Sequence, residues 1–253
     1  MSRHEHWQIA PATPITLHMH EVHVWRASLE QPEAVFWKLQ ATLSADEFER
    51  ASCFQFEQHR RRFVVARGVL RDILGRYLGV AANVITFEYE THGKPKLAKA
   101  KHPENFCFNL SHAKELALCA ITRGHALGVD VEHIHPISDA EQIARRFFSE
   151  REAGQFCALP QEQKQIAFFN CWTRKEAFIK ALGEGLSHPL DRFEVAFLPG
   201  ELAALLQTRP DPQEAERWSM FAFEPAADYA GALVVAGKNF ALQYWQWQGY
   251  GFD

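Results

Sequence analysis

The sequence lacks any long hydrophobic run. No apolar stretch approaches the roughly 18 residues that a membrane-spanning helix needs, and the longest are short segments such as residues 232–236. Residues 1–14 are polar and lack the apolar stretch of a secretory signal. The sequence therefore predicts a cytoplasmic protein without a membrane segment.

Paired cysteines and excess positive charge are also missing. None of the five cysteines forms a CxxC pair, and their mostly apolar neighbours predict reduced, buried thiols, with neither a zinc site nor a disulfide framework. The formal net charge of −4 gives no overall attraction to nucleic acid. The cluster Arg60, Arg61 and Arg62 could still bind a small anion, although by default it is a solvated helix face.

Several common catalytic motifs are absent. The sequence has no GxSxG segment, no P-loop and no kinase motif, which disfavours hydrolases and the usual nucleotide phosphotransferases. It also has no repeat of fixed period.

The composition is that of a globular protein. With 253 residues, 47% of them hydrophobic, one large domain and two small ones are equally compatible with the length. Apolar alternation predicts strands at 15–25, 84–89, 106–110, 116–122 and 129–132, and apolar spacing of three and four predicts helices at 33–78, 138–148, 150–159, 161–182 and 201–206. The two halves have similar expected helix and strand content, which predicts an α/β fold of two similar subdomains, 1–126 and 127–253.

The helix expected before residue 78 has a clear apolar stripe. It runs through Phe63, Ala66, Val69, Leu70, Ile73, Leu74 and Tyr77. We expect Arg62, Arg67 and Arg71 on its polar side.

An acidic pair ends the strand expected at 129–132. Asp130 and Glu132 are two residues apart, so both carboxylates lie on one face of a strand. Two neighbouring anions repel each other unless a cation bridges them, and hard oxygen ligands suit Mg²⁺. A solvated strand end is the alternative.

A third candidate carboxylate lies on the helix expected at 161–182. Glu176 and Lys180 are four residues apart and share a helix face, as a simple surface pair also would. Glu176 borders the apolar stripe between Trp172 and Ile179, which predicts a half-buried carboxylate.

Polar groups that could hold an anion occur in two other places. Ser111 and His112 end a strand and can both hydrogen-bond to an anion, and the turn at Lys94 and Pro95 could expose a lysine to a ligand. Histidines two or three apart, at 4–6, 18–23 and 133–135, could chelate a transition metal, but strand alternation produces the same spacing.

In chain order, five motifs resemble those of the surfactin-type 4′-phosphopantetheinyl transferases. They are GKP at 93–95, NLSH at 109–112, GVDVE at 128–132, RFF at 146–148 and WTxKEAxxKAxGxGL at 172–186. The resemblance spans residues 21–195, and segments 21–25 and 59–67 look most like cyanobacterial members.

The resemblance implies the 4′-phosphopantetheinyl transferase fold, with two subdomains in a pseudo-twofold arrangement in a monomer and coenzyme A in the cleft between them. It also implies that Asp130, Glu132 and Glu176 hold Mg²⁺ against the coenzyme A pyrophosphate, and that Lys180 contacts the phosphates.

Other motif residues would bind the rest of coenzyme A. The resemblance implies that Ser111 and His112 lie at the 3′-phosphate and that Lys94 and Pro95 border the adenine.

Arg62 and Arg67 are the further candidates for phosphate contacts that the N-terminal half offers. This half departs from the family pattern, because Glu47 and Arg50 stand where some members have lysines.

The implied reaction moves phosphopantetheine from coenzyme A to a serine of an apo acyl or peptidyl carrier protein in fatty-acid, polyketide or peptide synthesis. It requires charge neutralisation on the pyrophosphate, by Mg²⁺ and Lys180, and a proton acceptor, either Glu176 or a metal-bound water. Adenosine 3′,5′-bisphosphate would leave. Asp130, Glu176 and Lys180 are therefore the candidate catalytic residues.

Two alternatives belong to other classes. A non-catalytic module binding coenzyme A or a nucleotide would use the same basic and polar residues, and another Mg²⁺-dependent phosphotransferase would use the same carboxylates. The three-carboxylate set disfavours the binding module, because it adds negative charge beside an anionic ligand.

Overall fold

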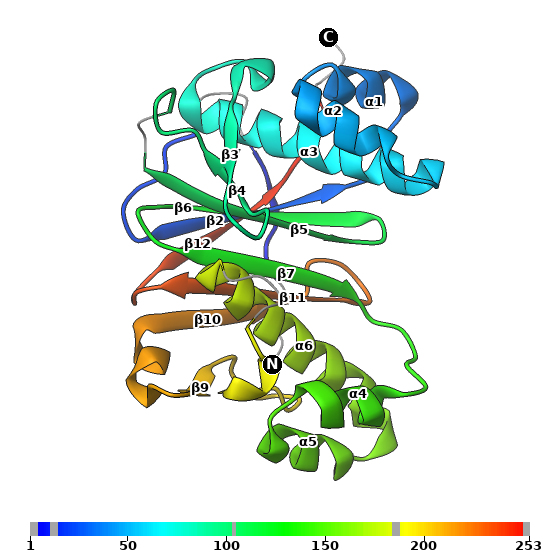
Figure 1. The fold of residues 1–253 in the computed structure, drawn as a ribbon, viewed down its shortest axis with the longest axis vertical. Coiled ribbons are helices and arrows are strands. Elements are labelled where there is room, and N and C mark those ends of the chain that lie inside the picture. Colours follow the sequence, from blue (N-terminus) through cyan, green and yellow to red (C-terminus); the bar gives the residue numbers. More distant parts are fainter. Residues whose placement is uncertain (1–4, 11–14, 103–104, 184–187, 250–253) are drawn as a thin grey trace. The chain divides into compact units, whose positions relative to one another are not determined.

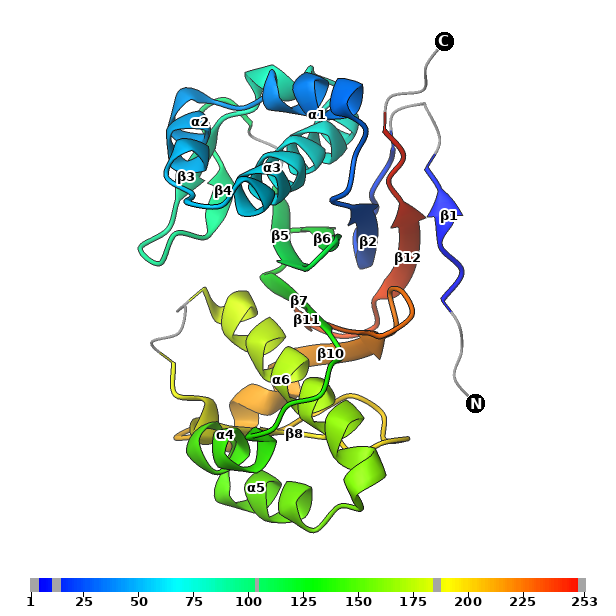
Figure 2. The same cartoon turned by 90° about the vertical axis from the view of Figure 1, so that its right-hand side faces the viewer.

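The computed structural model describes residues 5–10, 15–102, 105–183 and 188–249 (Figures 1 and 2). Contacts between Cα atoms divide the chain into two compact units. Unit 1 comprises residues 1–5, 90–94 and 125–240, and unit 2 comprises residues 6–89, 95–124 and 241–253. The simple division at residues 126 and 127 stays a prediction.

Unit 2 contains a five-stranded sheet with the order β1-β12-β2-β6-β5. Its strands are β1 (Gln8–Ile9), β2 (Glu21–Ser28), β5 (Phe106–Ala113), β6 (Leu116–Arg123) and β12 (Ala241–Gln246). β12 lies parallel to both β1 and β2, whereas β6 is antiparallel to its two neighbours. The strand expected at 15–25 thus begins only at Glu21.

Helices α1 (Glu33–Gln40), α2 (Ala45–Ser52) and α3 (Glu57–Leu78) fill the range expected to be helical and pack over one face of this sheet (Figure 2). α2 starts with a capping box, in which Ser44 and Glu47 satisfy backbone groups at the helix N-terminus. α3 ends at Gly79, whose φ of 66° is the left-handed conformation that favours glycine.

The predicted apolar stripe of α3 is confirmed, because Ala66, Val69, Leu70, Ile73 and Leu74 are buried in the core of unit 2. The expected polar side of α3 is partly wrong. Arg67 and Arg71 are also buried, since both face Glu47 of α2 and pair with it.

A small hairpin follows α3. The 3₁₀ turn η1 (Ala82–Val84) leads into β3 (Phe87–Tyr89), which pairs antiparallel with β4 (Pro95–Leu97). The strand expected at 84–89 therefore forms only in its second half.

Unit 1 is built on a three-stranded antiparallel sheet, β10-β11-β7. The strands are β7 (Leu127–His133), β10 (Trp218–Phe223) and β11 (Tyr229–Ala236), and α6 (Gln161–Leu182) packs along β7 and β11 (Figure 1). α4 (Ala140–Phe147) and α5 (Glu150–Cys157) pack on α6, and the remaining elements are η3 (Leu190–Arg192), β8 (Phe193–Val195), β9 (Leu205–Thr208) and η4 (Pro212–Arg217).

The helix expected at 201–206 is wrong. Residues 201–204 form no helix, and Leu205 opens β9, which pairs antiparallel with β8. Leu202 is 90% exposed, so the apolar residues of this stretch do not form one buried face. Pairing with a distant strand outweighs local helix propensity here.

All five cysteines are free. Cys119 and Cys171 are buried as expected, whereas Cys53 is exposed. No helix in the described part of the chain combines the length and the apolar character needed to cross a bilayer.

A buried polar cluster lies inside unit 2. His23 of β2 is 1% exposed, and its Nδ1 lies 2.7 Å from the hydroxyl of Tyr77. The indole of Trp25 donates to the same hydroxyl at 2.8 Å, and Nε2 of His23 lies 3.6 Å from the carboxylate of Glu21. Burial lowers the pKa of His23 to about 4, and the Glu21 carboxylate opposes only part of this effect.

This cluster predicts acid sensitivity. Because the pKa of His23 falls from 6.5 in the unfolded chain to about 4 in the folded one, its contribution to stability is present above pH 6.5 and is lost as the pH falls towards 4. The full shift corresponds to up to about 3 kcal/mol. Between pH 7 and pH 4, the melting temperature of His23→Gln should fall less steeply than that of the wild type. His59→Gln, at an exposed site, should keep the wild-type dependence of melting temperature on pH. Identical slopes in all three proteins would contradict this role.

Candidate active site

β7 presents its two carboxylates to α6. Gly128, Asp130 and Glu132 alternate along the strand and so share one face, and Gly128 shows that this face is the one α6 covers. A Cβ built on Gly128 would lie 2.2 Å from the carbonyl oxygen of Ala177 in α6, so only glycine allows this approach. Asp130 is buried, at 3% exposed, and Glu132 is partly buried.

α6 brings the other two charged groups. Glu176 and Lys180 lie one turn apart on α6, and Glu176 is half-buried, as its place beside the apolar stripe predicted. The ammonium of Lys180 lies 2.5 Å from Oδ1 of Asp130. The structure therefore brings together Asp130, Glu132, Glu176 and Lys180.

The carboxylates of this group repel one another. Burial, followed by the charge of Asp130, raises the pKa of Glu132 to about 7. The same two causes raise the pKa of Glu176, and Lys180 opposes the rise in both. One lysine does not balance three carboxylates, so the group as a whole favours an added cation.

The donor set fits Mg²⁺ better than a closed transition-metal site. Within the described residues, no three His, Cys, Asp or Glu side chains are arranged as a ready metal-binding group. Mg²⁺ commonly takes only one or two protein carboxylates and completes its shell with water and substrate phosphate. Partly buried carboxylates with raised pKa values are the ligands that such an ion would stabilise in ionised form.

Lys94 also belongs to unit 1. Its ammonium donates to the carbonyl oxygens of Leu127, at 2.9 Å, and Lys180, at 2.6 Å, and so ties the start of β7 to the end of α6. α6 ends at Gly183, whose φ is 77°. The last two motif residues, Gly185 and Leu186, lie outside the described residues.

The other candidates belong to unit 2. Ser111 is buried and His112 exposed near the end of β5, and Pro95 opens β4. Arg62 lies 3.7 Å from Glu30 and 4.0 Å from Glu115, and Arg67 is paired with Glu47.

Two family models match most of the chain. The model of the 4′-phosphopantetheinyl transferase superfamily matches residues 126–234, and that of the 4′-phosphopantetheinyl transferase N-terminal region matches residues 23–123. The chain is 43% identical to the 4′-phosphopantetheinyl transferase HetI of Nostoc sp. over 96% of this chain and 99% of that protein. The chain belongs to the 4′-phosphopantetheinyl transferase superfamily.

Other members of the superfamily are more distant. A putative 4′-phosphopantetheinyl transferase of Synechocystis sp. is 30% identical, over 78% of this chain and 77% of that protein. The 4′-phosphopantetheinyl transferase Sfp of Bacillus subtilis is 31% identical, over 60% of this chain and 66% of that protein. The resemblance noted from the motifs, and its cyanobacterial character, are thus confirmed.

A buried ion pair behind the site was not expected from the sequence. Lys175, next to Glu176, is fully buried, and its ammonium lies 2.7 Å from Glu152 of α5 and donates to the carbonyls of Leu190 and Phe193. The available signal was the spacing of Ser149 and Glu152, which form the capping box of α5. This pair joins α5, α6, η3 and β8.

Gly128→Ala tests the contact between β7 and α6. The added methyl group would overlap the backbone of α6, so we expect a loss of about 1–3 kcal/mol of stability together with a large drop in transferase activity, because Asp130 moves away from Lys180. Thermal unfolding and an activity assay measure the two effects.

Gly154→Ala in α5 is the matched control. A Cβ at this exposed helical position meets nothing within 4 Å, so the change should be neutral or stabilising by about 0.5–1 kcal/mol. A Gly128→Ala protein as stable and active as this control would contradict the proposed packing.

Proposed function

We propose that the chain transfers the 4′-phosphopantetheine group of coenzyme A to a serine of an apo acyl or peptidyl carrier protein, with the chemistry at the β7–α6 group of unit 1. Membership of the superfamily supports the reaction. The observation that supports the site is the gathering of Asp130, Glu132 and Glu176 around Lys180. A non-catalytic module that binds coenzyme A would gain nothing from three carboxylates beside an anionic ligand.

Asp130, Glu132 and Glu176 are the residues that would hold Mg²⁺, some directly and the others through waters of its shell. When bound, Mg²⁺ neutralises charge on the pyrophosphate of coenzyme A. Lys180 pairs with Asp130, and with coenzyme A bound its ammonium would contact the phosphates. The lysine would thus compensate negative charge of both a carboxylate and the transferred phosphoryl group.

Glu176 is the proposed general base. Its carboxylate would accept the proton of the attacking serine hydroxyl while the β-phosphoryl group passes to that oxygen and adenosine 3′,5′-bisphosphate leaves. Partial burial raises the pKa of Glu176, which makes its carboxylate a stronger proton acceptor than an exposed glutamate.

The remaining contacts to coenzyme A follow the motif matches. We assign Ser111, His112 and Arg62 to the 3′-phosphate and Pro95 to the adenine. Lys94 borders the adenine through its place in the turn, while its ammonium contacts backbone carbonyls. A monomeric state and a cytoplasmic location stay predictions.

The function is tested directly with purified protein, coenzyme A, Mg²⁺ and an apo carrier protein. Mass spectrometry of the carrier should show the added phosphopantetheine group, and the modification should disappear when a chelator removes Mg²⁺. A carrier whose mass stays unchanged under all conditions would contradict the proposed activity.

Glu176→Gln separates metal binding from base catalysis. The substitution keeps the size of the side chain but removes its charge and its proton affinity. If Glu176 is the base, the rate should stay about 10²-fold or more below wild type at every Mg²⁺ concentration. A higher Mg²⁺ concentration can fill a weakened metal site, but it cannot replace a missing proton acceptor.

Transfer rates across a Mg²⁺ titration measure this. Glu162→Gln, at an exposed position in the first turn of the same helix, should leave the rate unchanged. Full recovery of Glu176→Gln at high Mg²⁺ would remove Glu176 as the base.

A further inference from the structure

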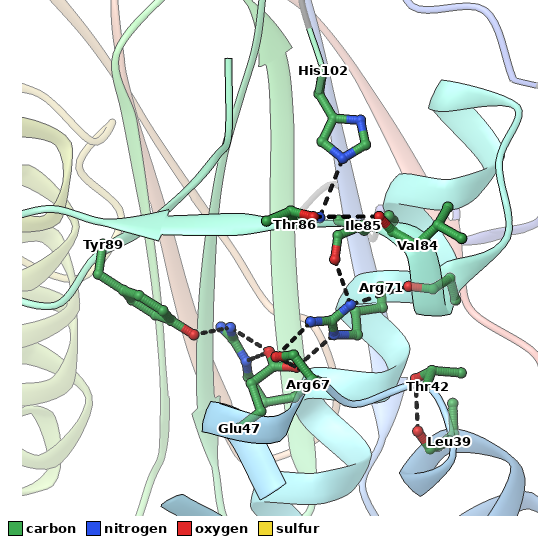
Figure 3. Close-up of polar contacts among 12 residues, drawn as sticks. Leu39, Thr42, Glu47, Arg67, Arg71, Val84, Ile85, Thr86, Tyr89 and His102 are labelled. Carbon is green, nitrogen blue, oxygen red and sulfur yellow. Dashed lines mark hydrogen bonds and ion pairs between the residues drawn. The ribbon is translucent and has the colours of Figure 1, made fainter. Parts of the chain in front are cut away.

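A buried charge network joins α2, α3 and β3 in unit 2. Figure 3 shows Glu47 of α2 between two arginines of α3, with Arg67 also reaching Tyr89 of β3. The exposed fractions are 1% for Glu47, 7% for Arg67 and 0% for Arg71. Charges buried this deeply destabilise a fold unless each is paired and hydrogen-bonded.

All three guanidinium nitrogens of Arg71 form hydrogen bonds within unit 2. Its Nε donates to Glu47 at 2.6 Å, one terminal nitrogen donates to the carbonyls of Ala82 and Ile85, and the other donates to Ser44. These contacts hold α2 and the η1 turn against α3.

Arg67 connects the same glutamate to the β3–β4 hairpin. Its Nε lies 2.6 Å from the second carboxylate oxygen of Glu47, and a terminal nitrogen donates to the hydroxyl of Tyr89 at 2.9 Å. Its guanidinium also lies over the ring of Phe87, 4.8 Å from the centroid. Phe87 and Tyr89, which alternate on one face of β3, therefore both contact Arg67.

The hairpin needs such an anchor. β3 and β4 are three residues each and form a sheet of their own, and an isolated pair of short strands is only marginally stable in water. Another tether is the contact from the backbone of Thr86 to His102 at the base of the hairpin (Figure 3). Tyr89, at the other end of β3, is held through Arg67 and through a hydrogen bond between its hydroxyl and the carboxylate of Asp46 in α2.

The position of Tyr89 determines that of Pro95. Tyr89 is the direct cross-strand partner of Pro95. A shift of Tyr89 therefore moves Pro95 with it.

We infer that Glu47, Arg67 and Tyr89 are positioning residues that set the place of Pro95 for the adenine of coenzyme A. This inference rests on the proposed function, which assigns Pro95 to the adenine. It differs from the expectation that Arg67 contacts a phosphate, because Glu47 and Tyr89 engage two of the three nitrogens of its guanidinium.

The two roles for Arg67 make different predictions for 3′-dephospho-coenzyme A. A residue that positions the adenine site serves both ligands equally, since both carry adenine. A residue that binds the 3′-phosphate matters only for coenzyme A.

Steady-state kinetics of Tyr89→Phe and Arg67→Met with each ligand test the inference. We expect KM to rise about threefold to tenfold for both ligands, with their ratio unchanged and kcat within about twofold of wild type.

Glu88→Gln is the control on the same strand. Glu88 pairs with Lys96 at 3.7 Å on the exposed side of the hairpin. The KM values of the Glu88→Gln variant should therefore equal those of the wild type. If Arg67→Met does not fold, the KM values of Tyr89→Phe test the inference alone, since this substitution removes only a hydroxyl group.

Two results would overturn the inference. One is a loss confined to coenzyme A, which would make Arg67 a phosphate ligand. The other is a lower melting temperature with unchanged KM values, which would make the network a purely structural one. Failure of the proposed function would appear separately, as a wild-type protein that does not modify the carrier.

Discussion

The direct backbone contact between β7 and α6 at Gly128 is the constraint on which the proposed active site depends. It sets the distance between a strand that supplies Asp130 and Glu132 and a helix that supplies Glu176 and Lys180. Burial between this strand and helix, followed by the charge of Asp130, raises the pKa values of Glu132 and Glu176. A single missing Cβ thus allows the whole charge group to form.

Both units place ionised groups in their interiors, and in each unit one such group has its nitrogens hydrogen-bonded or ion-paired. Lys175 contacts Glu152 and two backbone carbonyls, and Arg71 contacts Glu47, Ser44 and two carbonyls. Groups satisfied in this way hold their elements in one arrangement, since any shift would leave a charge unpaired in a medium of low polarity. The Asp130–Lys180 pair is different, because substrate phosphate and a metal ion can replace each partner.

Periodic patterns were the predictable part of this fold. α6 forms over the residues expected, and the period of two in β7 correctly placed Asp130 and Glu132 on one face. Errors arose where distant partners decide the outcome. Arg67 and Arg71 were expected on a polar face because a helix pattern cannot show that Glu47 of α2 faces them, and β9 forms at Leu205 because β8 lies beside it. Lys175 was missed because its partner lies 23 residues upstream in another helix, at Glu152.

The place of β12 has a consequence for how the chain is made. β1 and β2 do not pair with each other, because β12 lies between them. During synthesis from the N-terminus, β1 has no neighbouring strand until residues 241–246 have left the ribosome, whereas every strand of the β10-β11-β7 sheet is by then already available. The part of the sheet nearest the start of the chain is thus the last to be completed. Gene fragments that end before β12 should give a sheet with an open edge along β2, prone to pairing with other chains.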